Sequence, residues 1–235
     1  MTTYRIKFSK NDSAKFISHL DVMRCFQRAI KRADLPIGYS KGFNPHQLMS
    51  FAQPLTLGTT STGEYGDFEF AEVLPASEIK ERLNAVMPTG FAIENVVRLK
   101  EKTLNSMASV EGASYTVKFL KGITADMLKN GLDGYLNRDE IIVVKKTKKS
   151  CKQANIRGDI LEIKDISENG SAEIFMLLNA GSRHNLKPDS VVESICDYFG
   201  IPYDKFCAAY NRVNLFRLDE NNKLVGLDEG VSSDE

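Results

Sequence analysis

Alternation of apolar and polar residues marks the strands expected in the first hundred residues. Residues 4–9, 64–70 and 91–99 alternate in this way, which is the pattern of a strand that buries one face. Residues 48–52 form a shorter apolar segment, and Pro54 limits how far such a strand can pair. The pattern therefore predicts four strands in this part of the chain.

Two segments instead place apolar residues three or four positions apart, which is typical of an amphipathic helix. Ser18 is a candidate N-cap of the first, whose apolar positions are Val22, Phe26, Ala29, Ile30 and Ala33. Residues 77–86 repeat the spacing. The order is then β-α-β-β-α-β, the ferredoxin-like arrangement with two helices on one face of an antiparallel sheet. We therefore expect an α+β fold, with a ferredoxin-like domain in residues 1–103.

The same architecture is expected a second time, after a polar linker at residues 101–113. The elements predicted there are strands at 115–120, 141–144, 159–166, 172–178 and 213–218, and helices at 124–136 and from Pro188. These elements include one strand more than the four strands of a ferredoxin-like domain. The sequence thus predicts two ferredoxin-like domains in tandem, the second in residues 114–222. Residues 223–235 form an acidic tail, disordered at 228–235.

Charge is spread unevenly along a chain whose formal net charge is zero. Through residue 50 there are nine lysines and arginines against three aspartates, an excess of six positive charges. Arg24, Arg28 and Lys31 share a face of the first helix that is distinct from its apolar face. A solvated surface accounts for three such cations about as well as a binding site does. The loop that follows favours binding, and the charge favours an anionic partner.

That loop has the sequence Ser40-Lys41-Gly42-Phe43-Asn44-Pro45-His46. Its glycine permits a positive φ and its proline fixes φ, so its own residues favour a defined shape. Its phenylalanine is able to stack on a base or to fill the seam between helix and sheet, and packing is the favoured interpretation. The candidate binding residues of this region are Arg24, Arg28, Lys41, Gly42, Phe43, Asn44 and His46.

A second polar loop precedes the helix predicted at Pro188. Arg183 and His184 lie in this loop and are candidates for binding an anion near a helix N-terminus, although a plain surface loop is equally consistent with them. A basic cluster at residues 145–152 follows a predicted strand. It is either a solvated hairpin loop or, if it lies on the same side as Arg24, an extension of a phosphate-binding groove.

Histidine and cysteine positions give no sign of a bound metal, cluster or other cofactor. His19, His46 and His184 are scattered without paired ligand spacing, and the four cysteines form no CxxC motif. Cys25 and Cys196 lie in predicted helices and are expected to be buried. Neither a signal peptide nor an apolar run of about 18 or more residues is recognised, so a soluble, cytoplasmic protein is expected.

Several short motifs together resemble the bacterial radical-SAM-linked family, a domain of unknown function fused to or encoded beside radical S-adenosylmethionine proteins. The matching residues are Ser18-His19-Leu20-Asp21, Arg24, Arg28-Ala29, Gly42-Phe43-Asn44-Pro45-His46, Ser50-Phe51, Pro54-Leu55, Leu57-Gly58, Ser61, Glu64-Tyr65 and, more loosely, Leu186 to Val191. Gln47 and Thr56 depart from the pattern, since the family prefers proline at both positions. The resemblance implies a radical S-adenosylmethionine protein as partner.

Three functions are consistent with these residues. The first is an accessory binding module that acts with the radical enzyme and presents an RNA or ribosomal substrate to it, through phosphate contacts. The second is a metal-independent RNA-processing enzyme in which His46 or His19 is the general acid or base and Arg24 or Lys41 stabilises phosphate charge. The third is a purely protein-binding adaptor. The sequence contains no complete catalytic constellation, which favours the first.

Overall fold

The computed structural model describes residues 1–146 and 151–233. The chain divides into two compact units. Unit 1 contains Met1–Glu111 and the chain from Arg212 onward, and unit 2 contains Gly112–Asn211. Within the described residues, no helix is both long and apolar enough to cross a membrane. Each unit mixes helices with mainly antiparallel strands, so the predicted α+β class is confirmed.

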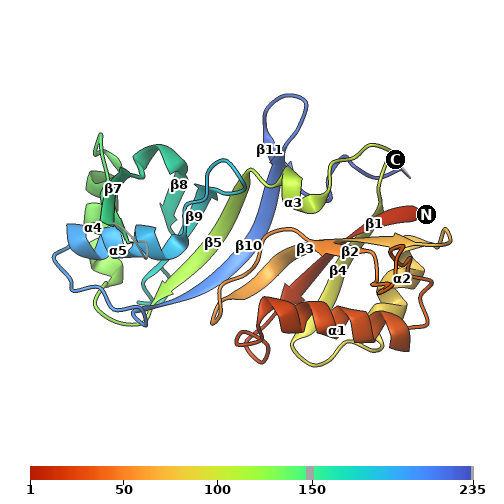
Figure 1. Cartoon of the computed structure of the whole chain (residues 1–235). Helices are drawn as coiled ribbons and strands as arrows, with labels where there is room; N and C mark the ends of the chain where they lie inside the picture. The colour runs from red at the N-terminus through yellow and green to blue at the C-terminus, as the bar shows by residue number, and fades with distance from the viewer. Residues whose placement is uncertain (147–150, 234–235) are drawn as a thin grey trace. The chain divides into compact units, whose positions relative to one another are not determined.

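Unit 1 is built on a sheet in which β1 lies between β3 and β4 and pairs antiparallel with both (Figure 1). β2 also pairs antiparallel with β3, and β10 is the next neighbour of β3. The elements of unit 1 are β1 (Thr2–Lys10), α1 (His19–Arg32), β2 (Met49–Phe51), β3 (Thr60–Phe70), α2 (Ala76–Asn84), β4 (Phe91–Arg98), α3 (Ser106–Ser109), β10 (Ala208–Leu218) from Arg212, and β11 (Leu224–Gly226). The first six elements lie where the sequence pattern predicts them.

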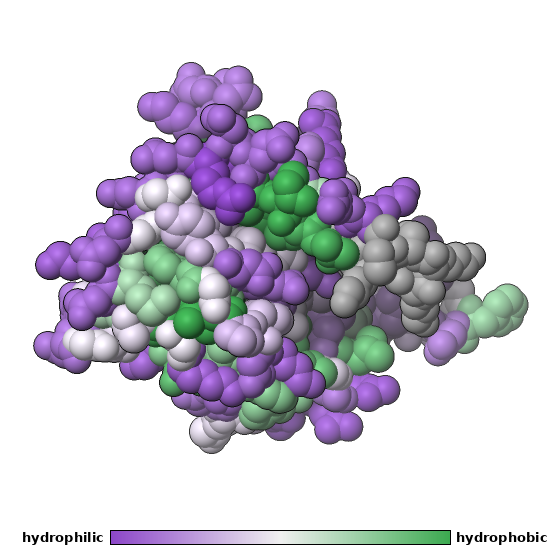
Figure 2. Space-filling model, turned by 90° about the vertical axis from the view of Figure 1, so that its left-hand side faces the viewer, coloured by the Kyte–Doolittle hydropathy of each residue, from purple (hydrophilic) through white to green (hydrophobic). Residues whose placement is uncertain are grey.

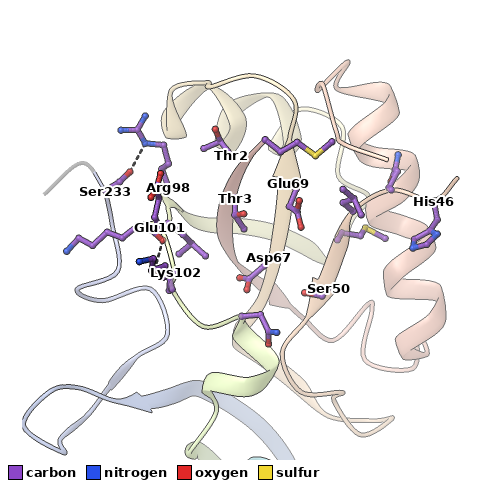
Figure 3. Close-up of a pocket in the computed structure, with 18 residues that line it drawn as sticks. Thr2, Thr3, His46, Ser50, Asp67, Glu69, Arg98, Glu101, Lys102 and Ser233 are labelled. Carbon is purple, nitrogen blue, oxygen red and sulfur yellow. Dashed lines mark hydrogen bonds between the residues drawn. The ribbon is translucent and has the colours of Figure 1, made fainter. Parts of the chain in front are cut away.

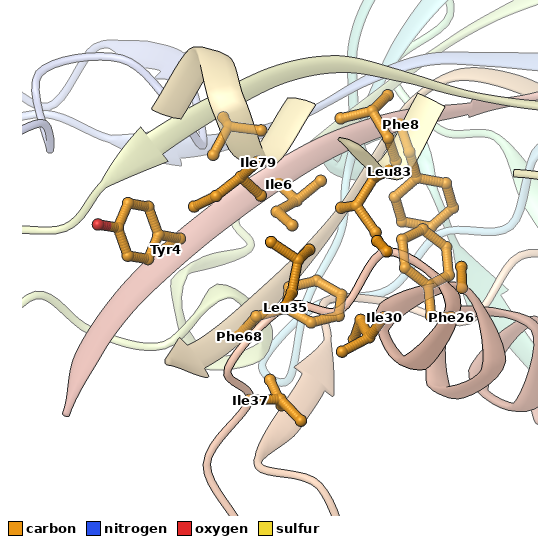
Figure 4. Close-up of a cluster of buried hydrophobic side chains, with 14 of the residues drawn as sticks. Tyr4, Ile6, Phe8, Phe26, Ile30, Leu35, Ile37, Phe68, Ile79 and Leu83 are labelled. Atoms are coloured by element: carbon orange, nitrogen blue, oxygen red, sulfur yellow. The ribbon is translucent and has the colours of Figure 1, made fainter. Parts of the chain in front are cut away.

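The core of unit 1 lies between the sheet and helices α1 and α2 (Figure 4). Tyr4, Ile6 and Phe8 are buried on the helix side of β1, because alternate side chains of a strand point to one face. Ile79 and Leu83 of α2 are fully buried beside them, as are the apolar positions of α1. The period-two and helical patterns of the sequence therefore meet in one apolar layer.

A buried ion pair lies on the opposite face of the same sheet. Arg5 Nε donates to Asp67 Oδ1 at 2.8 Å, and neither side chain has appreciable contact with solvent. The Arg5 guanidinium also donates to the carbonyls of Leu227 and Leu104, both at 2.8 Å. Asp67 Oδ2 accepts the backbone N–H of Ser106 at 2.6 Å. This pair therefore fixes α3, within the stretch predicted to be a linker, and the returning C-terminal segment onto unit 1.

Through Ser233 the C-terminal segment differs from the predicted disordered tail, whose last two residues, 234 and 235, lie outside the described residues. Leu227 is fully buried, and Asp228 accepts hydrogen bonds from Tyr65 and from Asn95, both at 2.8 Å. A bridge joins Ser232 to Leu99 of unit 1. The acidic composition suggested disorder, but the apolar residues between the acidic ones find a place in the core, and burial of apolar surface offsets the entropy of ordering.

Unit 2 contains three strands that pair antiparallel in the order β5-β9-β8, with the start of β10 beside β5. β6 and β7 form a separate two-stranded sheet. The elements are β5 (Gly112–Phe119), α4 (Ala125–Leu136), β6 (Ile142–Lys146), β7 (Cys151–Asn155), the short 3-10 helix η1 (Arg157–Asp159), β8 (Ile160–Asp165), β9 (Glu173–Asn179), α5 (Pro188–Tyr198) and the start of β10.

The surface that faces the viewer in Figure 2, the left-hand side of Figure 1, is mainly hydrophilic, with a few apolar areas.

The boundary between the units differs from the predicted one. Strand 213–218 was expected to close the second domain, but from Arg212 onward β10 belongs to unit 1. Arg212 explains this placement, because its side chain is 2% exposed and forms a buried ion pair with Glu64 of β3. A partner that lies so far away in the sequence leaves no local signal.

Candidate functional site

Helix α1, which carries basic residues, has a hydrogen-bonded N-terminus. The predicted N-cap is confirmed, since Ser18 Oγ accepts the backbone N–H of Asp21 at 3.2 Å. The Ser18 hydroxyl also donates to the Asp21 carboxylate at 2.7 Å, and Arg24 donates to the same carboxylate at 2.9 Å. Together these hydrogen bonds, that of Ser18 first, hold the pKa of Asp21 below its ordinary value.

Replacing Ser18 with alanine is expected to raise the pKa of Asp21 toward that of an ordinary aspartate. A lowered carboxylate pKa stabilises the fold above the unfolded pKa, and this stabilisation is lost as the pH falls through the folded pKa. A carbon NMR titration of the Asp21 carboxyl group in both proteins measures the change. Arg24→Ala is the comparison and should produce a smaller rise, because the Ser18 bond is the larger cause. An unaltered pKa in Ser18→Ala contradicts the assignment.

The remaining cations near α1 are uncompensated. Arg28, Lys31 and Lys41 are exposed, and none of them makes an ion pair or side-chain hydrogen bond within residues 1–146 and 151–233. Arg24 is also exposed, but it forms an ion pair with Asp21. We call these four residues the basic surface. Its uncompensated charges attract an anion through solvent, and they do so less at high salt.

The loop after α1 is closed at its base by Ser40 and His46. The backbone N–H of Ser40 donates to the His46 carbonyl at 2.9 Å, and the His46 N–H donates to Ser40 Oγ at 3.1 Å. Ser40 Oγ and His46 Nδ1 share a further hydrogen bond of 2.8 Å. Gly42 has a φ of +124°, the positive value that glycine was predicted to supply. Residues 41–45 between these ends are all exposed.

Phe43 at the tip of this loop does not pack in the seam between helix and sheet, so the favoured interpretation was wrong. Its relative exposure is 110%, more than that of any other large apolar side chain described. Phe8, Phe26 and Phe51 already fill the seam, with ring centroids 4.8 to 5.8 Å apart. An aromatic ring held this far into solvent by an ordered loop is available to a partner.

Gln47 connects the loop to the basic helix. Its Nε2 donates to the carbonyl of Gln27 in α1 at 3.4 Å, which places the end of the loop beside the residue that precedes Arg28. The structure thus brings the basic surface and the loop together. Gln47 is only 6% exposed, yet its Oε1 has no hydrogen-bond partner in the described chain. Proline, expected at this position from the family resemblance, would offer no such acceptor.

A cavity of about 610 Å³ opens next to this loop, on the sheet face that carries Asp67 (Figure 3). Its lining comes from the start of β1, from β2 and the chain before it, from β3, and from the chain after β4. His46 stands at one side, and Arg98, Glu101 and Lys102 stand at the other. No local sequence pattern indicates this cavity, because its lining combines segments from both ends of unit 1.

His19 lies in a different and much smaller cavity of about 20 Å³. Its ring makes an edge-on contact with Phe51 at 5.9 Å. Lys10 also lines this cavity, and its ammonium donates to the carbonyls of Lys15 and Ile17, while burial lowers its pKa. The two histidines proposed as alternative acids or bases therefore line separate cavities. Lys10 was not singled out from the sequence, where it stands among several surface-type lysines.

Arg183 and His184 belong to unit 2. Both are exposed, and His184 Nδ1 lies 3.2 Å from Asp159 Oδ1. This contact gives His184 a structural partner within its own unit. Residues 147–150, the middle of the basic cluster at 145–152, lie outside the described residues. The two interpretations of that cluster both remain predictions.

Cys25, Cys196 and Cys207 are free thiols that form no disulfide. Cys196 is buried as predicted, and burial, together with the neighbouring Cys207, raises the pKa of its thiol to about 12. Cys25 is only partly buried, and that burial raises its pKa. Within the described ranges no three histidine, cysteine or carboxylate side chains are grouped so that they could hold a metal ion. A thiol with a raised pKa is a weak nucleophile, so neither cysteine is a candidate site residue.

Comparisons with known proteins identify a family. No curated protein matches the sequence. Among 26 matching chains of solved structures is a crystal structure of an unknown protein from Galdieria sulphuraria, with 10% identity, coverage of 90% of this chain and 96% of that chain, and a TM-score of 0.26. A likeness at that TM-score establishes neither a shared fold nor a shared function. The family model for uncharacterized proteins conserved in bacteria, DUF2344, matches residues 3–188. The chain therefore belongs to the DUF2344 family.

Proposed function

We propose that this chain is a binding module for single-stranded RNA, acting through the basic surface and the loop 40–46. The observation that carries the proposal is the fully exposed Phe43 on a loop closed by Ser40 and His46, beside uncompensated cations. Binding of single strands without sequence preference combines backbone contacts from cations with stacking on aromatic rings. Both components are present within one short stretch of unit 1.

The local order of the loop supports this function. A flexible loop would lose conformational entropy on binding, which costs affinity. Here the Ser40–His46 hydrogen bonds are already formed, and the glycine and proline between them restrict the backbone. Lys41 and Phe43 are therefore presented to a partner at a small further cost in entropy. Arg28 adds a planar guanidinium suited to a phosphate.

We further propose that both units are ferredoxin-like. In unit 1 the strand order β4-β1-β3-β2, with α1 and α2 on one face, supports this assignment. In unit 2 the order β10-β5-β9-β8 supports it as well, with β6 and β7 as the extra elements. Ferredoxin-like sheets serve as RNA platforms in other proteins, which is an analogy of fold and carries less weight than the exposed residues.

The partner proposed for the module is a radical S-adenosylmethionine protein. This part of the proposal comes from the resemblance of the motifs around Ser18 and Gly42 to the radical-SAM-linked family. In that arrangement the module holds the RNA and the partner carries out the chemistry. The cations that bind phosphate are equally able to meet an acidic patch on a protein, so the test has to separate the two partners.

Binding of a fluorescein-labelled 20-nucleotide oligouridine, followed by anisotropy, tests the RNA function. Phe43→Ala is expected to weaken binding about 5- to 100-fold, because stacking contributes about 1–3 kcal/mol per base. Arg28→Ala/Lys41→Ala should reduce the magnitude of the slope of log K against log salt by about 1.4, which is about 0.7 for each phosphate contact to a single strand. Phe206→Ala and Lys129→Ala, exposed residues of unit 2, are the matched controls.

Two outcomes would contradict the proposal. The first is oligouridine affinity that neither Phe43→Ala nor the double substitution changes. The second comes from an affinity pull-down from lysate of the native host with and without nuclease. Recovery of a radical enzyme that survives nuclease but is lost in Arg24→Ala/Arg28→Ala/His46→Ala would make the basic surface a protein-docking face instead.

A further inference from the structure

The 610 Å³ cavity offers one carboxylate acceptor that the described protein residues leave unused. Glu69 of β3 is half-buried on the cavity floor and makes no ion pair or side-chain hydrogen bond in the described chain (Figure 3). Gln47 lines the same cavity and is nine-tenths buried, with Oε1 unpaired among the described residues. That oxygen is itself out of reach from the cavity, so Glu69 is the acceptor available to a ligand that brings N–H groups.

The opposite wall carries positive charge. Arg98 at the end of β4 and the following Lys100 and Lys102 line it together with Glu101, so its net charge is positive. Arg98 is oriented by a 2.6 Å hydrogen bond from its Nε to Ser233 Oγ. Figure 3 shows Arg98 and Lys102 on one side of the cavity and Glu69 nearer to His46. A ligand that spans the cavity therefore meets the Glu69 carboxylate on the floor, and three cations with one carboxylate, Glu101, on the opposite wall.

These features distinguish between classes of ligand. A free amino acid has an ammonium and a carboxylate, but it fills only a small part of 610 Å³ and needs a single cation for its carboxylate. A nucleotide fits the volume better, and its phosphate suits several cations. Among the four RNA bases only guanine presents two adjacent N–H donors, N1–H and N2–H, on one edge. A carboxylate accepts both of them together, whereas the corresponding edges of adenine and cytosine pair one donor with an acceptor.

We propose that this cavity binds a guanosine 5′-phosphate unit. The Glu69 carboxylate accepts N1–H and N2–H of guanine, and Arg98, Lys100 and Lys102 hold the phosphate. The unit is either a free nucleotide or an unpaired guanosine of an RNA strand. The site is distinct from the basic surface, so it stands whether or not oligouridine binds through Phe43.

Calorimetric titration of the full chain with GMP, IMP and AMP tests the site. GMP is expected to bind about 5- to 100-fold more tightly than AMP, the worth of one bidentate contact to a base. IMP lacks the N2 amino group and should bind with intermediate affinity. Glu69→Gln keeps the size of the side chain but offers one acceptor, and it should remove most of the preference for GMP. Glu72→Gln, an exposed carboxylate three residues further along, should keep it.

The preference of the wild-type protein is measured without any substitution, so the test does not depend on the folding of a variant. Equal affinity for GMP, IMP and AMP, or a GMP preference that survives Glu69→Gln, overturns the proposal. The trinucleotides AGA and AAA separate the two sources of the guanosine unit, a free nucleotide and an RNA strand. Tighter binding of AGA than of GMP, lost in Glu69→Gln, assigns the site to RNA, and tighter binding of GMP assigns it to the free nucleotide.

Discussion

Replacing Arg5 with leucine is expected to lower the free energy of unfolding by about 3–5 kcal/mol, because it leaves one partner of a buried ion pair uncompensated. Asp67 would keep only the N–H of Ser106, and the carbonyls of Leu104 and Leu227 would lose the guanidinium. Urea unfolding followed by circular dichroism measures the loss. The effect should include the C-terminal segment, which Arg5 holds through Leu227.

The double substitution Arg5→Leu/Asp67→Leu is the control. It removes both charges, and apolar replacements of a buried pair are often close to neutral, so it should recover a large part of the stability lost in the single variant. A double variant as unstable as Arg5→Leu would mean that the backbone contacts to Leu104, Leu227 and Ser106 matter more than the uncompensated charge. A loss below about 1 kcal/mol in the single variant would contradict burial of the pair.

Replacing Phe26 with alanine is expected to cost about 3–5 kcal/mol of stability, the range for removing a large buried ring. Phe26 is fully buried in α1 and its ring centroid lies 4.8 Å from that of Phe8, 5.3 Å from Phe51 and 5.5 Å from Phe68. Its removal leaves a cavity between the helix and the sheet, which cannot close without moving one of them. The free energy of unfolding by urea again gives the measurement.

Phe43→Ala is the matched control for this substitution, because it removes the same ring from an exposed position. Its stability should stay within about 0.5 kcal/mol of the wild type, as is usual for surface substitutions. The pair of variants therefore separates the two roles of phenylalanine in this stretch, packing in α1 and contact with a partner in the loop. Equal destabilisation by both would show that the loop packs against unit 1 in solution.

Sequence reasoning succeeded where a property repeats over a few neighbouring residues. The alternation in β1 and β3, the spacing in α1 and α2, the cap at Ser18 and the positive φ at Gly42 were all predicted, and the structure confirms each of them. These features depend on the backbone conformation of single residues or on the period of one element. The candidate residues of the basic surface and loop were also identified from the sequence, although their function is untested.

Tertiary structure alone decided the remainder. The pairs Arg5–Asp67 and Glu64–Arg212 join residues that are 62 and 148 positions apart, and no local pattern distinguishes these charges from solvated ones. The exposure of Phe43 depended on other rings filling the seam, and the cavity beside His46 depended on segments from both ends of unit 1. Period and propensity fix which face of an element is apolar. The partner of a buried charge, and the space left beside it, are fixed only when distant elements pack together, because desolvating a charge without that partner costs too much.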